Sequence, residues 1–362
     1  MINTRPRHKR LIAMAAATVA VSGLALAAYR GGHHGPVVFE RTPERIARGH
    51  YLTWGPPHCV RCHSEQVRDL PGDHPVPGRE FAGVKSNNGR VAANLTPDPE
   101  TGAGNWTDEQ LVRAIRQGIG HDGRQITAFM PWNAFSALSD EDVKSIVVYL
   151  RSIPPVRNPL PKGVEAKIED VIRDRVALTP PIAPATSDYK DDPVRRGEYL
   201  ARIGVCANCH TPVDAHDQRM VSYRLGGGRA EGGIAPNITP DPSGIAHYDE
   251  NMFIQTMRTG KVGGVRDLKG GMPWWYLGNL TDDDLRAIFA YLRTVTPVQH
   301  RVSTSEEETV CPVCGRKHGF GALNVPPGSV NPVMHTTEAS PEPPVFAAHL
   351  GTPRASIRRQ NP

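Results

Sequence analysis

The sequence predicts an all-α fold in which two tandem domains are built from the same set of short helices. Three observations support this prediction: an internal repeat, amphipathic segments that begin at capping residues, and a composition rich in proline and glycine. The chain has 362 residues, with 35 Gly and 34 Pro but only 6% aromatic residues. Loop-rich domains with few aromatic residues need a cofactor, a metal or disulfides to supplement their cores.

The repeat defines two domains, residues 42–156 and residues 190–298. Self-similarity along a chain is the first feature to seek in a sequence, because it decides the architecture. Four pairs of segments match: ARGHYLTWGPPHCVRCHS (47–64) with RRGEYLARIGVCANCHT (195–211), NLTPDPETG (94–102) with NITPDPSG (237–244), AFMPW (128–132) with GGMPW (270–274), and LSDEDVKSIVVYLRSIPPV (138–156) with LTDDDLRAIFAYLRTVTPV (280–298).

Each domain is predicted to contain three matched helices. Residues 44–52 and 194–200 form the first pair, 106–118 and 248–260 the second, and 139–153 and 281–295 the last. The last pair begins with Ser139 and Thr281, each followed by acidic residues, which is typical of a capped helix N-terminus. We expect the first and last helices of a domain to cross where Gly49 or Gly197 permits close approach.

Three further segments lie outside the repeat. Residues 1–30 carry basic residues followed by nineteen residues without a charge, which predicts an export signal or a membrane anchor helix. Residues 157–189 form a proline-rich linker, and residues 299–362 form a loop-rich C-terminal extension that ends in a Pro/Ser/Thr-rich tail. The balance of 42 Lys+Arg against 37 Asp+Glu gives no indication of a nucleic-acid-binding protein.

A Cys-x-x-Cys-His motif occurs once in each repeat. The motifs consist of Cys59, Cys62 and His63 in domain 1 and of Cys206, Cys209 and His210 in domain 2. A zinc site needs about four ligands, usually from two separated pairs, whereas each repeat has one cysteine pair. A disulfide would leave the adjacent histidine unexplained. Covalent haem c uses all three residues, because the thiols bond the porphyrin and the histidine ligates the iron. The motifs therefore predict two covalently bound haem c groups.

The second axial iron ligand is predicted to be Met130 in domain 1 and Met272 in domain 2. Both methionines precede Pro-Trp at equivalent places in the repeats, in a loop and not on an apolar helix face. His/Met ligation occupies both faces of the iron and raises its potential. Asn94 and Asn237, in the matched N-[LI]-TPD stretches, either contact a haem edge or shape a turn.

The third cysteine pair differs from the first two. It lies in CPVCGRKHG (311–319), where His318 follows Cys314 by four residues and not by one, so the spacing does not fit haem attachment. Three alternatives remain open: a disulfide between Cys311 and Cys314, which an oxidising compartment would permit, a metal site that includes His318 and another ligand, or a degenerate haem site.

On these residues the chain resembles the class I c-type cytochromes, in particular the multihaem cytochrome c subunits of membrane-bound alcohol, gluconate and related dehydrogenases. The residues that carry the resemblance are the Arg-Gly-x-Tyr-Leu stretches before Cys59 and Cys206, both Cys-x-x-Cys-His motifs, the N-[LI]-TPD and Met-Pro-Trp segments, and the acidic helices that end in Tyr-Leu-Arg. The resemblance implies short helices wrapped around a covalent haem in each domain. Members of this branch often carry three haem domains, and this chain has two.

The resemblance also implies a function and a location. A cytochrome of this type takes electrons from a dehydrogenase subunit or another redox protein and passes them to quinone or a terminal oxidase of the respiratory chain. We expect it on the periplasmic side of the bacterial inner membrane, anchored there if residues 1–30 are retained, or free in the periplasm if they are cleaved. An adaptor subunit with incidental haems is a further alternative.

A haem enzyme is the main alternative to an electron carrier. A dihaem peroxidase or a thiosulfate-oxidising cytochrome would need one iron with an exchangeable ligand and a nearby acid or base. The paired Met-Pro-Trp segments argue against it, while His121 and His247 are the side chains that leave it open. We therefore expect no catalytic residues and an electron-transfer protein.

Overall fold

The computed structural model describes residues 37–67, 74–87, 89–163, 184–230, 233–269 and 271–326. The expected signal or anchor segment, the middle of the linker and the end of the tail lie outside the described residues. Both repeats belong to one compact unit, residues 1–324. Within the described residues, no helix combines the length and apolar character needed to cross a membrane.

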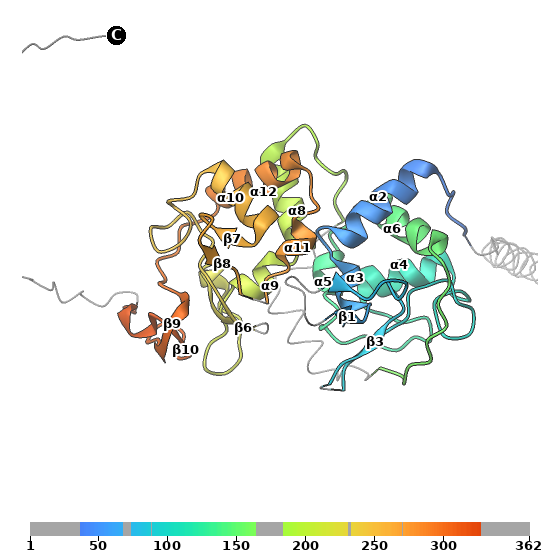
Figure 1. The fold of residues 1–362 in the computed structure, drawn as a ribbon, viewed down its shortest axis with the longest axis horizontal. Helices are drawn as coiled ribbons and strands as arrows, with labels where there is room; N and C mark the ends of the chain where they lie inside the picture. The colour runs from blue at the N-terminus through green and yellow to red at the C-terminus, as the bar shows by residue number, and fades with distance from the viewer. Residues whose placement is uncertain are drawn as a thin grey trace, which may run out of the picture. The chain divides into compact units, whose positions relative to one another are not determined.

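Domain 1 is built from short helices joined by loops, drawn in blue to green in Figure 1. Its elements are α2 (Pro43–Trp54), α3 (Cys59–Cys62), β1 (Gln66–Val67), β2 (His74–Pro75), β3 (Val84–Lys85), β4 (Val91–Ala92), α4 (Asp108–Gln117), α5 (Trp132–Phe135) and α6 (Asp140–Ser152). The strands pair within two short antiparallel hairpins, β1 with β2 and β3 with β4.

Domain 2 repeats the helices of domain 1 in the same order. Its elements are α8 (Pro193–Ile203), α9 (Cys206–His210), η1 (Val221–Tyr223), β5 (Gly228–Ala230), β6 (Gly233–Ala235), α10 (Glu250–Thr259), β7 (Lys261–Val262), β8 (Arg266–Asp267), α11 (Trp274–Leu277) and α12 (Asp282–Thr294). The three predicted helix pairs are confirmed, with ends that differ from the prediction by a few residues.

The first and last helices of each domain cross at a glycine, as predicted. A Cβ atom built on Gly49 in α2 would lie 2.0 Å from the backbone oxygen of Ser145 in α6. A Cβ built on Gly197 in α8 would lie 1.8 Å from the backbone oxygen of Ala287 in α12. Real Cβ atoms do not come so close to a carbonyl oxygen, so only glycine permits each crossing.

The predicted capping residues begin the last helices. The Ser139 hydroxyl accepts a 3.1 Å hydrogen bond from the Asp142 backbone N–H, and the Thr281 hydroxyl accepts a 3.2 Å bond from the Asp284 N–H. Each bond satisfies a backbone donor that has no partner inside the helix. Because both last helices begin in the same way, the third acidic residue of the first turn, Asp142 or Asp284, occupies an equivalent position in the two domains.

The C-terminal extension departs from the expected loop. Residues 299–324 contain an eight-residue strand, β9 (Ser303–Val310), which pairs antiparallel with β10 (Lys317–Gly319) and is followed by η2 (Gly321–Leu323). The segment STSEEETV has no clear alternation of apolar and polar residues, because none of its eight residues is buried. The repeats are mainly helical as predicted, but the all-α prediction missed this hairpin and the short hairpins within the repeats, β1–β2, β3–β4, β5–β6 and β7–β8.

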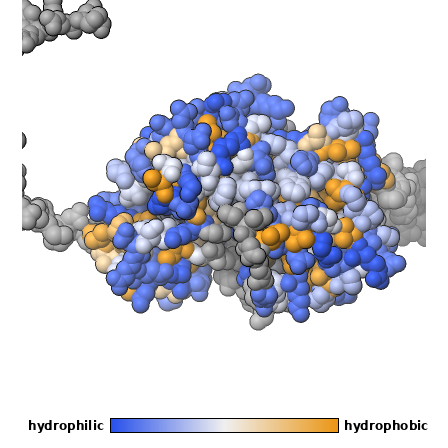
Figure 2. All heavy atoms as spheres, in the orientation of Figure 1, coloured by the Kyte–Doolittle hydropathy of each residue, from blue (hydrophilic) through white to orange (hydrophobic). Residues whose placement is uncertain are grey.

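Apolar side chains from both repeats form a shared core. Leu52, Leu138 and Leu150 of domain 1 belong to the same buried cluster as Leu200 and Leu285 of domain 2. The face shown in Figure 2 is mainly polar, with small apolar areas between charged residues. Continuity of the core through both repeats means that the domains stabilise each other.

Candidate functional site

The two cysteine motifs lie on matched single-turn helices. Helix α3 begins after His58, whose φ is 37°, and α9 begins after Val205, whose φ is 53°. This left-handed residue turns the chain sharply after the first long helix and starts the motif. None of these four cysteines forms a disulfide. Burial raises the pKa of the first thiol of each pair, Cys59 and Cys206, to about 12.

The histidine of each motif is buried and fixed in one orientation. The Nδ1–H of His63 donates a 2.8 Å hydrogen bond to the Ala93 carbonyl, and the Nδ1–H of His210 donates a 2.8 Å bond to the Pro236 carbonyl. Burial lowers the pKa of both imidazoles, which favours the neutral ring. A neutral imidazole that donates through Nδ1 keeps its Nε2 lone pair for a metal ion.

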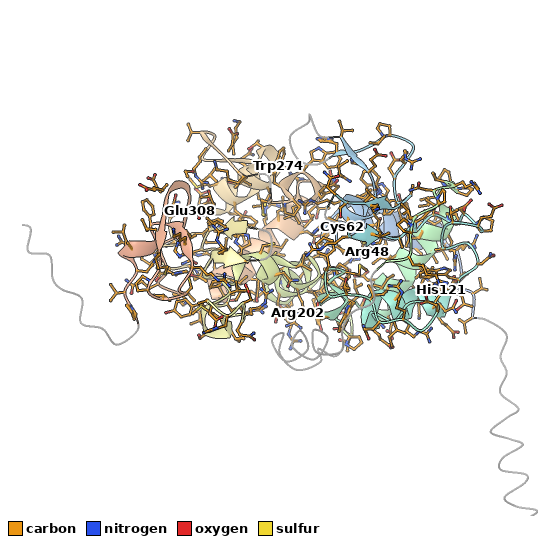
Figure 3. The ribbon with its side chains drawn as sticks, turned by 90° about the horizontal axis from the view of Figure 1, so that it is seen from below. Arg48, Cys62, His121, Arg202, Trp274 and Glu308 are labelled. Carbon is orange, nitrogen blue, oxygen red and sulfur yellow. The ribbon has the colours of Figure 1, made fainter. Side chains whose placement is uncertain are left out.

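A cavity of about 1460 Å³ opens beside the motif of domain 1. Its lining includes Cys59, Cys62, His63 and Met130. This volume exceeds the few hundred to 1,000 Å³ typical of a small-ligand pocket. Figure 3 places Cys62 on the blue part of the ribbon, within domain 1. The structure therefore brings together, around one cavity, the residues of the first predicted site.

The Met-Pro-Trp segments are built in the same way in both domains. The backbone N–H of Met130 donates to the Thr127 carbonyl at 3.1 Å, and that of Met272 donates to the Lys269 carbonyl at 3.1 Å. The tryptophan that follows packs on the glycine ending the preceding helix, Trp132 on Gly118 and Trp274 on Gly260. Both glycines have φ near +70° and leave no room for a Cβ. This packing fixes where each methionine lies.

The asparagines of the repeats shape turns. The Asn94 side-chain oxygen accepts hydrogen bonds from the backbone and hydroxyl of Thr96, and its Nδ2 donates to the Val156 carbonyl at 2.8 Å. Asn237 does the same with Thr239 and with the Val298 carbonyl at 2.7 Å. Each asparagine thus ties its loop to the chain that leaves the last helix. These bonds favour the turn over a haem-edge contact, although Asn94 also lines the cavity.

The two histidines on which the haem-enzyme alternative depended, His121 and His247, lie at the surface. His121 is exposed and stacks on Trp106, with 4.2 Å between ring centroids, although it also lines the cavity. His247 is exposed and contacts Tyr248 edge to face. Neither side chain is held in a buried position of the kind in which an iron ligand or a catalytic base is usually fixed.

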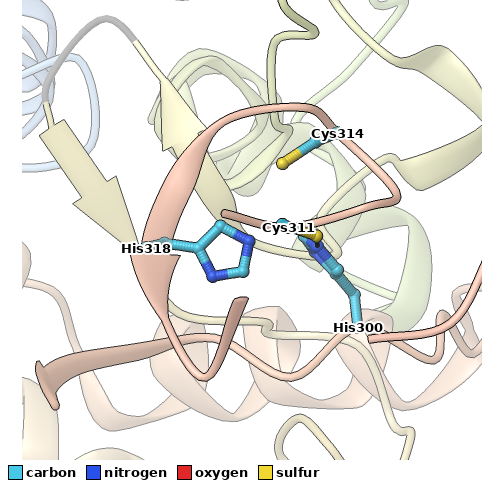
Figure 4. A group of neighbouring side chains, drawn as sticks. All are labelled: His300, Cys311, Cys314 and His318. Carbon is cyan, nitrogen blue, oxygen red and sulfur yellow. Dashed lines mark hydrogen bonds between the residues drawn. The ribbon is translucent and has the colours of Figure 1, made fainter. Parts of the chain in front are cut away.

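The third cysteine pair lies in a separate buried cluster. Cys311 and Cys314 are free thiols and lie beside His318, as the metal alternative requires. The fourth member is His300, which the sequence did not single out (Figure 4). His300 precedes Cys311 by eleven residues without a recognisable motif, so nothing in the sequence alone identified it.

A sequence profile of the protein family described as "Cytochrome C oxidase, cbb3-type, subunit III" matches residues 45–150 and 192–292. The two matched stretches together cover more than half of the chain, and each contains one Cys-x-x-Cys-His motif. The profile thus recognises both repeats separately.

Curated proteins show the same similarity. The chain is 35% identical over 266 residues to the fructose dehydrogenase cytochrome subunit of Gluconobacter japonicus, which covers 69% of this chain and 52% of that protein. It is 26% identical over 346 residues to the cytochrome c subunit of the quinone alcohol dehydrogenase of Gluconobacter oxydans, covering 81% and 68%. It is 27% identical over 280 residues to a dihaem cytochrome c-type protein of Cereibacter sphaeroides, covering 73% and 90%. The chain therefore spans about half of the length of the fructose dehydrogenase subunit.

Proposed function

Because the chain belongs to the c-type cytochrome family represented by subunit III of cbb3-type cytochrome c oxidase, we propose that it transfers electrons through two covalently bound haem c groups. The observation that carries this proposal is the presence, in both repeats, of two cysteines outside any disulfide, a buried imidazole that burial keeps neutral, and a methionine held by the same backbone contacts. The similarity to a dihaem cytochrome over 90% of its length supports two haems.

The residues of domain 1 fit a haem c group. Cys59 and Cys62 would form the thioether bonds, and the Nε2 of His63 and the sulfur of Met130 would ligate the iron. The cavity beside these four residues is large enough for an extended planar ring. Bound haem supplies reversible one-electron chemistry of its iron.

The protein residues tune that chemistry and exclude other reactions. The hydrogen bond from His63 to Ala93 orients the imidazole and raises its basicity as a ligand. The thioether of Met130 is a soft ligand that favours ferrous iron. With both faces occupied by protein ligands, the iron would have no position for peroxide or another substrate, which favours a carrier over an enzyme. In domain 2, Cys206, Cys209, His210 and Met272 take the same roles.

We further propose that the electron donor is a dehydrogenase and that the protein works on the periplasmic side of the inner membrane. The cytochrome subunits of fructose and alcohol dehydrogenases to which the chain is similar support a dehydrogenase partner. Haem attachment to c-type cytochromes and the basic-then-apolar start of the sequence support export. Electrons would leave toward quinone or a terminal oxidase.

Two measurements test the proposal. The intact mass and the pyridine haemochrome spectrum of the purified chain should give two haem c groups, and the ferric spectrum should show a methionine-to-iron charge-transfer band that accounts for both. Membranes solubilised in mild detergent should yield a dehydrogenase that copurifies with the chain and reduces it when given its own substrate. One haem only, or a high-spin iron that binds added ligands rapidly, would contradict the proposal.

A further inference from the structure

Four metal-ligating side chains of the C-terminal region converge in a buried cluster that electron transfer does not use. His300 lies after the end of α12, Cys311 and Cys314 lie in the turn between β9 and β10, and His318 lies in β10. Their exposed fractions are 0%, 0%, 2% and 0%, respectively. One ligand atom from each of the four lies within 4.8 Å of the others (Figure 4). His300 thus lies next to the turn between β9 and β10, although it precedes this turn by about ten residues in the sequence.

Both histidines have one nitrogen fixed by the backbone and the other directed into the cluster. The Nδ1–H of His300 donates to the Gly226 and Gly227 carbonyls, each at 3.1 Å, and its Nε2 lies 3.4 Å from the Sγ of Cys311. The Nδ1–H of His318 donates to the Gly319 carbonyl at 3.0 Å. Because carbonyls accept at Nδ1, both rings present an Nε2 lone pair.

The Nε2 of His318 is buried and has no hydrogen-bond partner among the described residues. A buried polar atom without a partner destabilises a fold, so its presence needs an explanation. Figure 4 shows the ring of His318 turned toward Cys311. A metal ion between the two histidines and the two sulfurs would satisfy this nitrogen, which a hydrogen-bonded cluster leaves unsatisfied.

We propose that His300, Cys311, Cys314 and His318 form a structural zinc site with two sulfur and two nitrogen ligands. With bonds of about 2.3 Å to sulfur and 2.0 Å to nitrogen, the edges of a tetrahedral site measure roughly 3.3–3.8 Å. The 3.4 Å separation of His300 Nε2 from Cys311 Sγ lies in this range. Four protein ligands leave no open position, so the site is structural and not catalytic.

The disulfide alternative does not explain the same observations. A disulfide would bond Cys311 to Cys314 at about 2.0 Å and would leave two buried imidazole nitrogens without a partner. The structure has both cysteines as free thiols. A degenerate haem site is excluded by the histidine geometry, since His300 and His318 approach the sulfurs themselves. Among metals, a tetrahedral set of two thiolates and two imidazoles suits zinc best.

The zinc site would fix the β9–β10 hairpin to the loop at Gly226 and Gly227, which in turn contacts the His210 motif. His300 is bonded to Gly227, whose backbone N–H donates to the His210 carbonyl at 2.8 Å. Asn237 donates to the His300 carbonyl at 3.2 Å and so joins the same network. The metal site itself does not depend on the proposed function. Its role in holding the loop that contacts His210, and so in positioning the second haem, does rest on that function.

Metal analysis of the purified full-length holoprotein tests the proposal. The protein is prepared without a polyhistidine tag, its haem is quantified by the pyridine haemochrome method, and its metals are measured by inorganic mass spectrometry. We expect about one zinc per chain in addition to the haem iron, and a zinc K-edge absorption spectrum that fits two sulfur and two nitrogen ligands. Because haem and zinc are measured separately, failure of one proposal is distinguishable from failure of the other.

Variants locate the zinc. Cys314→Ser and His318→Ala should lower the zinc content from about one per chain to less than about a tenth, without changing the haem content. Val313→Ala, between the two cysteines, and His247→Ala, an exposed histidine of domain 2, are the matched controls and should retain zinc. If the ligand variants do not fold, the absorption spectrum of the wild-type protein and its zinc uptake after dialysis against a chelator still decide the question.

Three results would overturn the proposal. The first is a wild-type protein without zinc. The second is iron in place of zinc at the site, seen as an iron content that exceeds the haem content. The third is a Cys311–Cys314 peptide that resists alkylation under denaturing, non-reducing conditions, which would show a disulfide.

Discussion

Tyr199 of domain 2 donates a 2.5 Å hydrogen bond from its hydroxyl to the Oδ2 of Asp142 in domain 1. The same hydroxyl accepts a bond from the backbone N–H of Ser139, the residue that caps α6. Arg48 of domain 1 donates to both oxygens of the Asp142 carboxylate, at 2.8 Å to Oδ1 and 2.9 Å to Oδ2. A tyrosine of one domain therefore binds the first turn of the last helix in the other domain, as acceptor for a backbone N–H and as donor to a carboxylate.

The reverse contact is also present. Tyr51 of domain 1 donates to the Asp284 carboxylate and accepts a bond from the Thr281 N–H, while Arg196 of domain 2 binds the same carboxylate. Tyr51 and Tyr199 occupy equivalent places in the Arg-Gly-x-Tyr-Leu stretches. The two domains thus exchange the same contact in both directions, as the subunits of a two-fold dimer do.

Removing one of these hydroxyls should weaken the interface between the domains. We expect Tyr199→Phe to lower the free energy of unfolding by about 1.5–3 kcal/mol, the usual contribution of a hydrogen bond to a charged group. Guanidinium unfolding of the holoprotein, followed by circular dichroism, measures the change. Tyr291→Phe is the control, because the Tyr291 hydroxyl makes no hydrogen bond within the described residues. Equal stability of both variants would show that the exchanged contact contributes little.

The crossing glycines should not tolerate a methyl group. Gly49→Ala and Gly197→Ala would each place a Cβ inside the van der Waals radius of a backbone oxygen, and we expect a loss of about 3 kcal/mol or more as the helices separate. The yield of soluble holoprotein and its unfolding midpoint measure the effect. Gly163→Ala is the control, because the nearest atoms to its Cβ would lie 3.6 Å away. An unchanged midpoint in Gly49→Ala would contradict the proposed close contact.

His58 should make stability depend on pH in the acid range. Burial lowers the pKa of this imidazole to about 4, below its ordinary value of 6.5. Above pH 6.5 the imidazole is neutral in both the folded and the unfolded chain, and the fold has its full stability. As the pH falls from 6.5 toward 4, the unfolded chain takes up the proton first, so the free energy of unfolding decreases. The loss should be on the order of 3 kcal/mol.

The variant His58→Asn removes the titrating group and tolerates the left-handed backbone at this position. Unfolding free energies of the wild type and of this variant, measured between pH 7 and pH 4, should converge as the pH falls. Parallel curves would show that the imidazole does not titrate as its burial requires.

The two methionines that we propose as axial ligands should set the potentials of their haems independently. Replacement of Met130 or Met272 by histidine should lower the potential of one haem only, by a fraction of the roughly 0.8 V that axial ligands span. The same replacement should halve the methionine-to-iron charge-transfer band. Spectroelectrochemical titration resolves the two haems, and Met252→Leu in α10 serves as the control. A variant that leaves both potentials unchanged would exclude that methionine as a ligand.

The repeat, the three helix pairs and both Cys-x-x-Cys-His motifs could be predicted from the sequence alone. These features are local: a Cys-x-x-Cys-His motif, a capping residue and a helical apolar pattern are each read within about fifteen residues, and the duplication provides an internal comparison. The glycine crossings were also predictable, because each glycine lies at the same place in a matched helix.

Which distant residues meet could not be predicted from the sequence and depends on the packing of the folded chain. The exchange of Tyr51 and Tyr199 between the domains depends on how two folded repeats pack, and no local pattern encodes it. His300 likewise joins Cys311, Cys314 and His318 only because its Nδ1 is hydrogen-bonded to the Gly226 and Gly227 carbonyls, which hold the ring beside the turn between β9 and β10. Hydrogen bonds and metal sites act over about 3–4 Å in space, whereas a sequence records only separation along the chain.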